Sequence, residues 1–292
     1  MHRNRKLSTT AAATAAAVLG LAALSGCSAA TKATGAATGA AKSAVVNVAD
    51  VMSLTTKKTA SATSLKMKMT EVMPKVGTIT ASGEMSRNPL AMKMTMSNPQ
   101  LTAQLGADSI QMMMTGSVMY MNLGDKGAAQ LGGKHWMKMD FASLGANGKA
   151  LSDQLNKSNG QDPSDAVKLL TSSGDIKKVG TETVDGVQTT HYSGVVDMKK
   201  LVATYSGGTA DSSFKTLVDQ ADKLGMSDET IDMWINADSL PVKVHEVAGT
   251  TQGPMDITID YSDFGNTPVV ITPPPASDTL DFADLLNKAK TG

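Results

Sequence analysis

Apolar and polar residues alternate along much of the chain between residues 64 and 141. In Leu90–Ser97 the apolar side chains at positions 90, 92, 94 and 96 are one leucine and three methionines, and Lys93, Thr95 and Ser97 lie among the positions between and after them. A period of two places successive side chains on opposite faces of a β-strand. One face of this strand is therefore predicted to be almost entirely methionine.

The same alternation recurs between turn residues such as Arg87-Asn88-Pro89 and predicts a series of short strands. Gly124–Gly133 is predicted to be a glycine-rich loop, and Leu101–Leu105 is predicted to be a strand. Seven short strands favour an antiparallel meander. The predicted strands are Ser64–Met73, Gly77–Ser86, Leu90–Ser97, Leu101–Leu105, Ser109–Thr115, Ser117–Asn122 and His135–Phe141.

The second half of the chain mixes helical and strand periods, which predicts an α+β sheet with its helices gathered on one face. No repeat or linker divides this region, so residues 44–285 are expected to form one domain. Predicted helices are Val45–Lys58, Asn147–Asn159, Pro163–Ser173, Asp197–Tyr205 and Ser212–Leu224. Predicted strands are Ile176–Val184, Val187–Val196, Thr230–Asn236, Leu240–Ala248 and Met255–Phe264, and Leu280–Lys288 is a short amphipathic segment.

Methionine is concentrated in the front half of the predicted sheet: 14 of the 20 methionines lie between residues 65 and 139. Methionine is a poor strand former, but its unbranched, polarizable side chain adapts to irregular apolar shapes. Two interpretations follow, a soft face that binds a lipid-like ligand or a loosely specified core. Trp136 and Trp234 stand one residue from the apolar positions of their predicted strands and so point to the opposite face. We therefore expect them to pack elsewhere or to lie at the rim of the binding face.

The N-terminus has the pattern of an export signal. A basic segment at residues 2–6 precedes the apolar stretch Ala11–Leu24, which is too short to span a bilayer. Leu24-Ser25-Gly26-Cys27 resembles the lipobox of bacterial lipoproteins, in which the cysteine receives a diacylglyceryl group and becomes the first residue. The alternative is an ordinary signal peptide with a chance cysteine. Cys27 is the only cysteine, so no internal disulfide can form.

Residues 27–43 are small and polar and are predicted to be a flexible tether that follows the signal peptide at residues 1–26. A coil of this length reaches roughly 20–24 Å. Two or three acyl chains hold a protein firmly on a bilayer. We therefore expect a lipid-anchored protein on the extracytoplasmic face of the cell membrane.

Charge and motifs exclude several function classes. Residues 27–292 carry 24 basic and 27 acidic side chains and show no basic stripe, which argues against nucleic acid as a partner. There is no G-x-S-x-G elbow and no phosphate-binding glycine loop. We therefore expect no catalytic residues and no cofactor. We also expect no metal site, because none of the histidines has metal-ligand spacing; they are His2, His135, His191 and His245.

Several short blocks resemble the actinobacterial LppX/LprAFG-type lipoproteins. Their order and spacing carry the resemblance, since no single block is highly specific. The blocks are Val179-Gly180, Glu182, Asp185-Gly186-Val187, Thr190-His191-Tyr192, Met233-Trp234-Ile235-Asn236, Leu240-Pro241, Tyr261–Gly265, Pro273–Pro275, Tyr120 and His135-Trp136-Met137-Lys138.

The resemblance implies an α+β fold of the LolA type, in which an incomplete antiparallel β-barrel of about ten or eleven strands wraps over helices. It further implies a hydrophobic cavity that accepts acyl chains of a lipid or glycolipid for envelope lipid transport, with an envelope transporter as a candidate partner. The alternative is an envelope sensor or scaffold that binds another protein through the same fold.

The apolar positions of the alternation are the candidate lining of that cavity. They are Leu65, Met67, Met69, Ile79, Met85, Leu90, Met92, Met94, Met96, Ile110, Met112, Met114, Met119, Met121, Met137, Met139, Ile231, Met233, Ile257 and Ile259.

Overall fold

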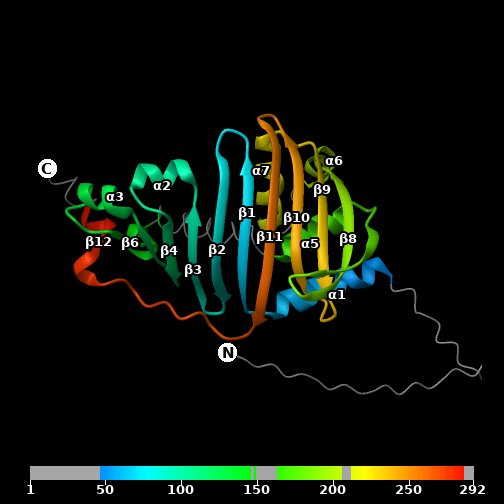
Figure 1. The fold of residues 1–292 in the computed structure, drawn as a ribbon, viewed down its shortest axis with the longest axis horizontal. Coiled ribbons are helices and arrows are strands. Elements are labelled where there is room, and N and C mark those ends of the chain that lie inside the picture. The colour runs from blue at the N-terminus through cyan, green and yellow to red at the C-terminus, as the bar shows by residue number, and fades with distance from the viewer. Residues whose placement is uncertain (1–46, 146–147, 149–162, 206–211, 286–292) are drawn as a thin grey trace, which may run out of the picture. The chain divides into compact units, whose positions relative to one another are not determined.

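The computed structural model describes residues 47–145, 148, 163–205 and 212–285, and one large sheet organises them (Figure 1). Its strands are β1 (Ser64–Met73), β2 (Gly77–Arg87), β3 (Leu90–Ser97), β4 (Ile110–Thr115), β5 (Val118–Asn122), β6 (Trp136–Asp140), β7 (Lys177–Val184), β8 (Val187–Asp197), β9 (Asp228–Asn236), β10 (Pro241–Thr250), β11 (Gly253–Gly265) and β12 (Thr279–Asp281).

The twelve strands follow the order β12-β6-β5-β4-β3-β2-β1-β11-β10-β9-β8-β7. Every neighbouring pair is antiparallel except β12 and β6, which are parallel. Within the described residues β12 and β7 remain the two edges, so the sheet does not close. The prediction of an open antiparallel sheet in an α+β fold is thus confirmed, with twelve strands rather than ten or eleven.

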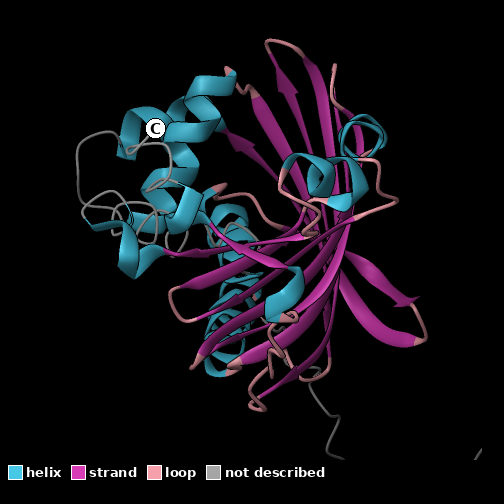
Figure 2. Cartoon of the chain, turned by 90° about the vertical axis from the view of Figure 1, so that its left-hand side faces the viewer, coloured by secondary structure: helices cyan, strands magenta, loops and turns pink. Residues whose placement is uncertain are grey.

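The helices are α1 (Val48–Ser61), α2 (Pro99–Leu105), α3 (Gly124–Gln130), α5 (Pro163–Ser172), α6 (Met198–Tyr205) and α7 (Ser212–Leu224), and short 3₁₀ turns lie at Phe141–Leu144 and Ala276–Asp278. Figure 2 shows the strong twist of the sheet and the helices against it. Side chains of α1, α5, α6 and α7 pack on one face of the sheet, which we call the inner face. Their buried contacts are Met52, Val167, Leu170, Met198 and Val218.

The prediction of a strand at Leu101–Leu105 was wrong, because capping residues make this segment the helix α2. The Asn98 side chain accepts hydrogen bonds from the backbone N–H groups of Gln100 and Leu101, both at 3.1 Å. Pro99 occupies the first helical turn and Gly106 ends the helix in a left-handed conformation. These are the signals that start and stop helices, and they outweigh a short apolar run.

The predicted loop at Gly124–Gly133 was also wrong, since its first part forms α3. The Asn122 side chain accepts a hydrogen bond from the Gly124 N–H at 2.9 Å, and Lys126 donates to the carbonyl of Ala103 in α2 at 2.7 Å. A side chain at Gly124 would approach the Leu105 carbonyl oxygen at 2.7 Å. Glycine at this position therefore allows the two short helices to pack closely. The glycine content of the segment predicted a loop because glycine is also common in loops.

Two other segments differ in their boundaries. The first two residues of the predicted amphipathic segment Leu280–Lys288 belong to the strand β12, and a helical turn follows from residue 282 to 285. Residues 286–288 lie outside the described part, as does nearly all of the predicted helix Asn147–Asn159. The first helix begins at Val48 because the Asn47 side chain caps it.

The backbone of β3 lies close to Gly83 of β2. A Cβ atom at this position would lie 2.3 Å from the carbonyl oxygen of Lys93 and 3.0 Å from the Cα atom of Met94. Both contacts are with backbone, so relief requires the strand pairing itself to move. We expect Gly83→Ala to destabilise the protein by roughly 1–3 kcal/mol, the usual cost of overpacking.

Chemical denaturation of the variant and of the unchanged protein measures this effect. Gly180→Ala is the matched control, because it lies in β7 and an added Cβ there meets nothing within 4 Å. Its stability should change little or rise slightly, since alanine restricts the unfolded chain. Equal stability of the two variants would contradict this explanation of Gly83.

Candidate functional site

The cross-strand register shows which apolar side chains share the inner face. Directly opposed residues in a sheet point to the same side. Met85 of β2 opposes Met92 of β3, which opposes Met114 of β4, and the row continues through Met119 to Met139. In the other direction Met69 opposes Ile259, which opposes Val244. All twenty side chains predicted to line a cavity lie on this one face.

The inner face is divided by the helices into two halves. In the half formed by β1 and β8–β11, side chains such as Met67, Ile231 and Met233 are buried under the helices and form the core. In the half formed by β3–β6, most of the methionines are only half-buried. We call these eight the methionine face: Met92, Met94, Met96, Met112, Met119, Met121, Met137 and Met139.

The structure also shows which side chains of β4 and β5 point to the inner face, although both faces of these strands are partly apolar. Met113 and Tyr120 oppose each other on the outer face and are buried there. Met112 and Met121 oppose each other on the inner face. Both interpretations of the methionines therefore apply: some fill the core, and eight form a continuous, partly accessible apolar surface, of which Met92 and Met94 also pack against the core.

A polar latch holds the strand at the edge of the methionine face. The Lys134 ammonium donates to the carbonyls of Ala276, Ser277 and Thr279, and the Lys138 ammonium lies 2.9 Å from the Asp281 carboxylate. These contacts fix β12 beside β6. Leu280 of β12 then opposes Met137 and extends the apolar face by one side chain.

His135 and Asp278 form the centre of this latch. The Asp278 carboxylate accepts from the His135 backbone N–H at 2.9 Å and lies 2.8 Å from the ring Nδ1. The hydrogen bond and the charge of Asp278 raise the pKa of His135. The backbone and ring hydrogen bonds from His135 lower the pKa of Asp278. The pair is therefore charged over a wider pH range than the isolated groups.

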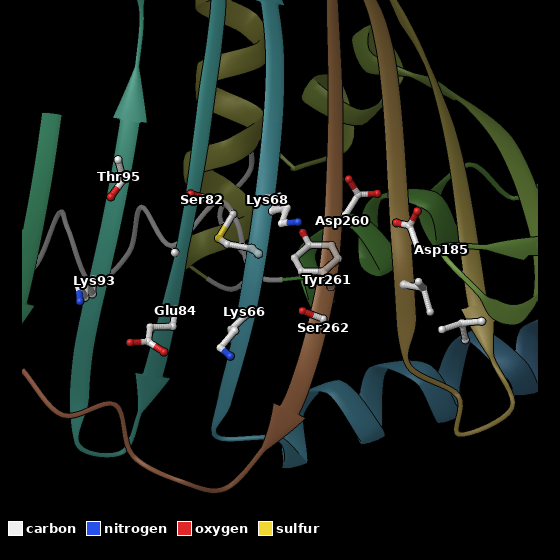
Figure 3. A pocket seen from close by; sticks show the side chains of 14 residues that line it. Lys66, Lys68, Ser82, Glu84, Lys93, Thr95, Asp185, Asp260, Tyr261 and Ser262 are labelled. Atoms are coloured by element: carbon white, nitrogen blue, oxygen red, sulfur yellow. The ribbon is translucent and has the colours of Figure 1, made fainter. Parts of the chain in front are cut away.

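Outside the inner face, a groove of about 670 Å³ lies over the outer side of β1, β2, β3 and β11 (Figure 3). Its charged lining alternates in sign, with Lys66 and Lys68 on β1 beside Glu84 on β2 and Asp260 on β11. Lys66 forms an ion pair at 2.8 Å with Asp263 at the groove's edge. This balance indicates a solvated polar face and gives no basic stripe for nucleic acid.

Residues from several of the recognised blocks meet on the outer face. The Trp234 indole N–H donates to Glu182 at 2.6 Å, and the rings of Trp234 and His191 stack with centroids 4.3 Å apart. His191 also lies 2.8 Å from Asp232. These contacts join β7, β8 and β9, so Trp234 has the predicted packing role. Among the described residues no group of three acidic, histidine or cysteine side chains is arranged to hold a metal ion.

Three carboxyl groups on the inner face were missed by the sequence reasoning. Glu71 points to the same face of β1 as Leu65, Met67 and Met69, because it continues their spacing of two residues. The sequence therefore already contained the signal that places Glu71 on this face. Glu229 and Glu246 interrupt the apolar positions of β9 and β10 in the same way. They occupy an otherwise apolar surface beside the core.

Comparisons with known proteins agree with the lipoprotein prediction. No family model matches the chain. An uncharacterized 31.2 kDa protein from Streptomyces griseus is 40% identical over 192 residues, which cover 63% of this chain and 61% of that protein. A Streptomyces coelicolor protein named "Putative lipoprotein" is 33% identical over 187 residues, covering 63% and 55%. Each match spans less than two thirds of the relative's length.

Two solved lipoprotein structures resemble the fold. LppX from Mycobacterium tuberculosis has a TM-score of 0.46 at 17% identity, covering 77% of this chain and all of that one. LprF from Mycobacterium bovis has a TM-score of 0.44 at 14% identity, covering 78% and 96%. Both names belong to the group that the sequence resembles. Within the described residues, none of the helices combines the length and apolar character needed to cross a membrane.

The latch generates a prediction about pH. The pKa of His135 is raised in the folded state, so the protonated ring stabilises the fold. This stabilisation is complete below about pH 6.5 and is lost as the pH rises through the raised pKa. The contribution of Asp278 is present above about pH 4 and is lost as the pH falls through its lowered pKa. The latch should therefore stabilise the fold most between about pH 4 and about pH 6.5.

An NMR titration of the His135 ring tests this expectation. The midpoint should lie above 6.5 in the unchanged protein and fall toward the ordinary histidine value in Asp278→Asn. Asp125→Asn is the control, because Asp125 lies farther from the ring, at 3.5 Å, and should shift the midpoint less. An unchanged midpoint in Asp278→Asn would show that the latch does not set the charge of His135.

Proposed function

We propose that this protein binds acyl chains of a lipid or glycolipid on the methionine face, as a lipid-anchored, non-enzymatic protein at the extracytoplasmic side of the cell membrane. The observation that carries the proposal is the group of eight half-buried methionines on the adjacent strands β3–β6. A contiguous apolar surface of this kind marks a binding site more often than a solvent face.

The chemistry of methionine suits flexible apolar ligands. Its side chain has three rotatable bonds and a polarizable sulfur atom, so it adapts to chains of different length and unsaturation. Burying one methylene group is worth roughly 0.8 kcal/mol. A ligand that buries about ten methylenes therefore gains roughly 8 kcal/mol, which corresponds to micromolar affinity before ordering costs are subtracted.

The N-terminal sequence supports the location. Acylation of Cys27 would attach the protein to the membrane surface, and the tether at residues 27–43 would let the folded part approach the bilayer. The relative named as a lipoprotein supports the same assignment. A tethered binding face next to a bilayer is suited to moving lipids within the envelope, with a membrane transporter as the partner that supplies or receives them.

The test places one charge on either face of the same strand. Met94→Asp puts a carboxylate on the methionine face and should weaken binding of a fluorescent fatty acid at least tenfold, because the charge must be desolvated when the chain binds. Thr95→Asp puts the same group on the exposed outer face and should leave affinity unchanged. Both variants are measured by fluorescence titration, and circular dichroism checks their folding.

Two outcomes would contradict the proposal. One is the failure of the unchanged protein to take up any acyl-chain probe. The other is equal binding by the Met94→Asp and unchanged proteins. If Met94→Asp instead lost a protein partner in a pull-down while its lipid affinity stayed normal, the sensor or scaffold function would replace lipid binding.

A further inference from the structure

Eight methionines occupy consecutive inner positions on four adjacent strands. The strands are β3, β4, β5 and β6, and each carries two of these residues. The group shares seven members with the methionine face and adds Met114, which is only 6% exposed. We call it the methionine array: Met92 and Met94 of β3, Met112 and Met114 of β4, Met119 and Met121 of β5, and Met137 and Met139 of β6.

The register arranges the array as two rows of directly opposed methionines. Any two neighbouring strands therefore bring four methionines together at the corners of a rectangle. Met85 of β2 extends the first row, whereas Gly83 lies opposite Met94 and ends the second. The first row is Met92, Met114, Met119 and Met139, and the second row is Met94, Met112, Met121 and Met137.

The corners of such a rectangle are close enough to share one ion. Directly opposed Cβ atoms are about 5 Å apart, and successive inner positions along one strand are about 6.6 Å apart. Each corner therefore lies roughly 4 Å from the centre. A methionine sulfur lies two covalent bonds beyond Cβ, and a bond to a metal ion adds about 2.3 Å, the length found for zinc and sulfur. Four thioethers can thus converge on one point above the sheet.

Methionines do not oppose one another in the helix-covered half of the inner face. Met67 lies opposite a glycine and a tyrosine, and Met233 lies opposite a valine and a tyrosine. A surface for acyl chains needs only apolar side chains, and isoleucine or valine suits a strand better than methionine. The unbroken pairing of sulfur atoms is therefore a feature that the acyl-chain function does not explain.

Thioether sulfur is a neutral, soft ligand, and this decides which ions suit the array. Soft sulfur ligands select soft ions such as copper(I). No array member can lose a proton to offset a second positive charge, so a monovalent ion is less costly to bury here than a divalent one. Within the described residues, no group of three acidic, histidine or cysteine side chains is arranged to hold a harder ion instead.

We propose that the methionine array binds a soft monovalent metal ion, copper(I), through the sulfur atoms of four methionines on two neighbouring strands. Each bond forms by donation of a sulfur lone pair, so no proton is released and no electron is transferred. Seven of the eight side chains are half-buried, which leaves the site accessible and limits competition from water. The site is independent of the acyl-chain function, since it depends on sulfur and not on apolar area.

Silver(I) is the probe for this site, because it is a soft monovalent ion like copper(I) and keeps its oxidation state in air. The full chain carries Cys27→Ser, which removes its one thiol and leaves methionine as the sulfur ligand. Isothermal titration calorimetry in chloride-free buffer measures binding of silver and, for comparison, of zinc. We expect silver to bind at least about tenfold more tightly than zinc. Copper(I) kept reduced by ascorbate should displace the silver.

Replacing the four central methionines by leucine removes their sulfur atoms and keeps the surface apolar. No complete rectangle remains in this variant, so silver should bind at least about tenfold more weakly. The fluorescent fatty acid should bind within about threefold of its affinity for the unchanged array, because the exchange conserves volume. Circular dichroism checks folding. The variant combines Met112→Leu, Met114→Leu, Met119→Leu and Met121→Leu.

The matched control exchanges four methionines outside the array and should keep its affinity for silver. Like the central four, it contains three half-buried residues and one buried residue. The control combines Met69→Leu, Met73→Leu, Met226→Leu and Met255→Leu.

Methyl NMR adds a measurement that needs no change in the array. The chain is labelled with ¹³C in the methyl groups of its 20 methionines, and silver is added. About eight of the signals should move, because only the array members have the paired arrangement that the proposed site requires. Signals from the other methionines should stay in place.

Each alternative result has a distinct meaning. Silver binding that survives in the array variant, that is lost in the control, or that moves methionine signals throughout the chain would overturn the site. Equal binding of zinc and silver would also overturn it. If silver does not bind but the fatty acid does, the metal site is wrong and the acyl-chain function stands. If silver binds and no acyl-chain probe does, the site stands and the proposed function fails.

Discussion

The antiparallel register is the constraint on which the other features depend. A slip of one residue in any strand pair would move a whole set of apolar side chains to the opposite face. Here the register is unbroken from β6 to β2, so that Met139, Met119, Met114, Met92 and Met85 form one row on a single side. The core and the methionine face are two parts of this one surface, and they differ in what covers them.

Coverage by helices converts one half of the inner face into a core. Helices α1, α5, α6 and α7 bury branched and aromatic residues of β8–β11 together with β1. The strands β3–β6 carry mainly methionine on the same face, and these side chains remain half-buried. Because methionine tolerates many packing arrangements, this half can accept an apolar ligand without a rigid template. Methionine is not confined to this half, however, because Met67 and Met233 lie in the core.

Polar groups mark the limits of this apolar surface. At one edge, Lys134, His135 and Lys138 hold β12 in place through carbonyls and carboxylates of β12 and of the turn before it. At the end of the face near β10, Glu229 and Glu246 lie among isoleucine and alanine with no described partner. The first group stabilises the fold at an accessible edge, whereas in the second group burial raises the pKa of both carboxyls.

The sequence by itself determined the strands with a clear period of two and the parity of their apolar positions, because alternation directly encodes which side of a strand faces the interior. All twenty positions chosen in this way share one face. The sequence did not determine α2 and α3, where Asn98 and Asn122 side chains and close glycine packing decided the local structure. Nor could it separate the methionines of the core from the half-buried ones, since both have the same pattern within a strand. Only the tertiary structure decided this, because coverage depends on where distant helices pack. The same holds for Glu71, whose strand β1 is far from β11 in the sequence and becomes its neighbour only through their pairing.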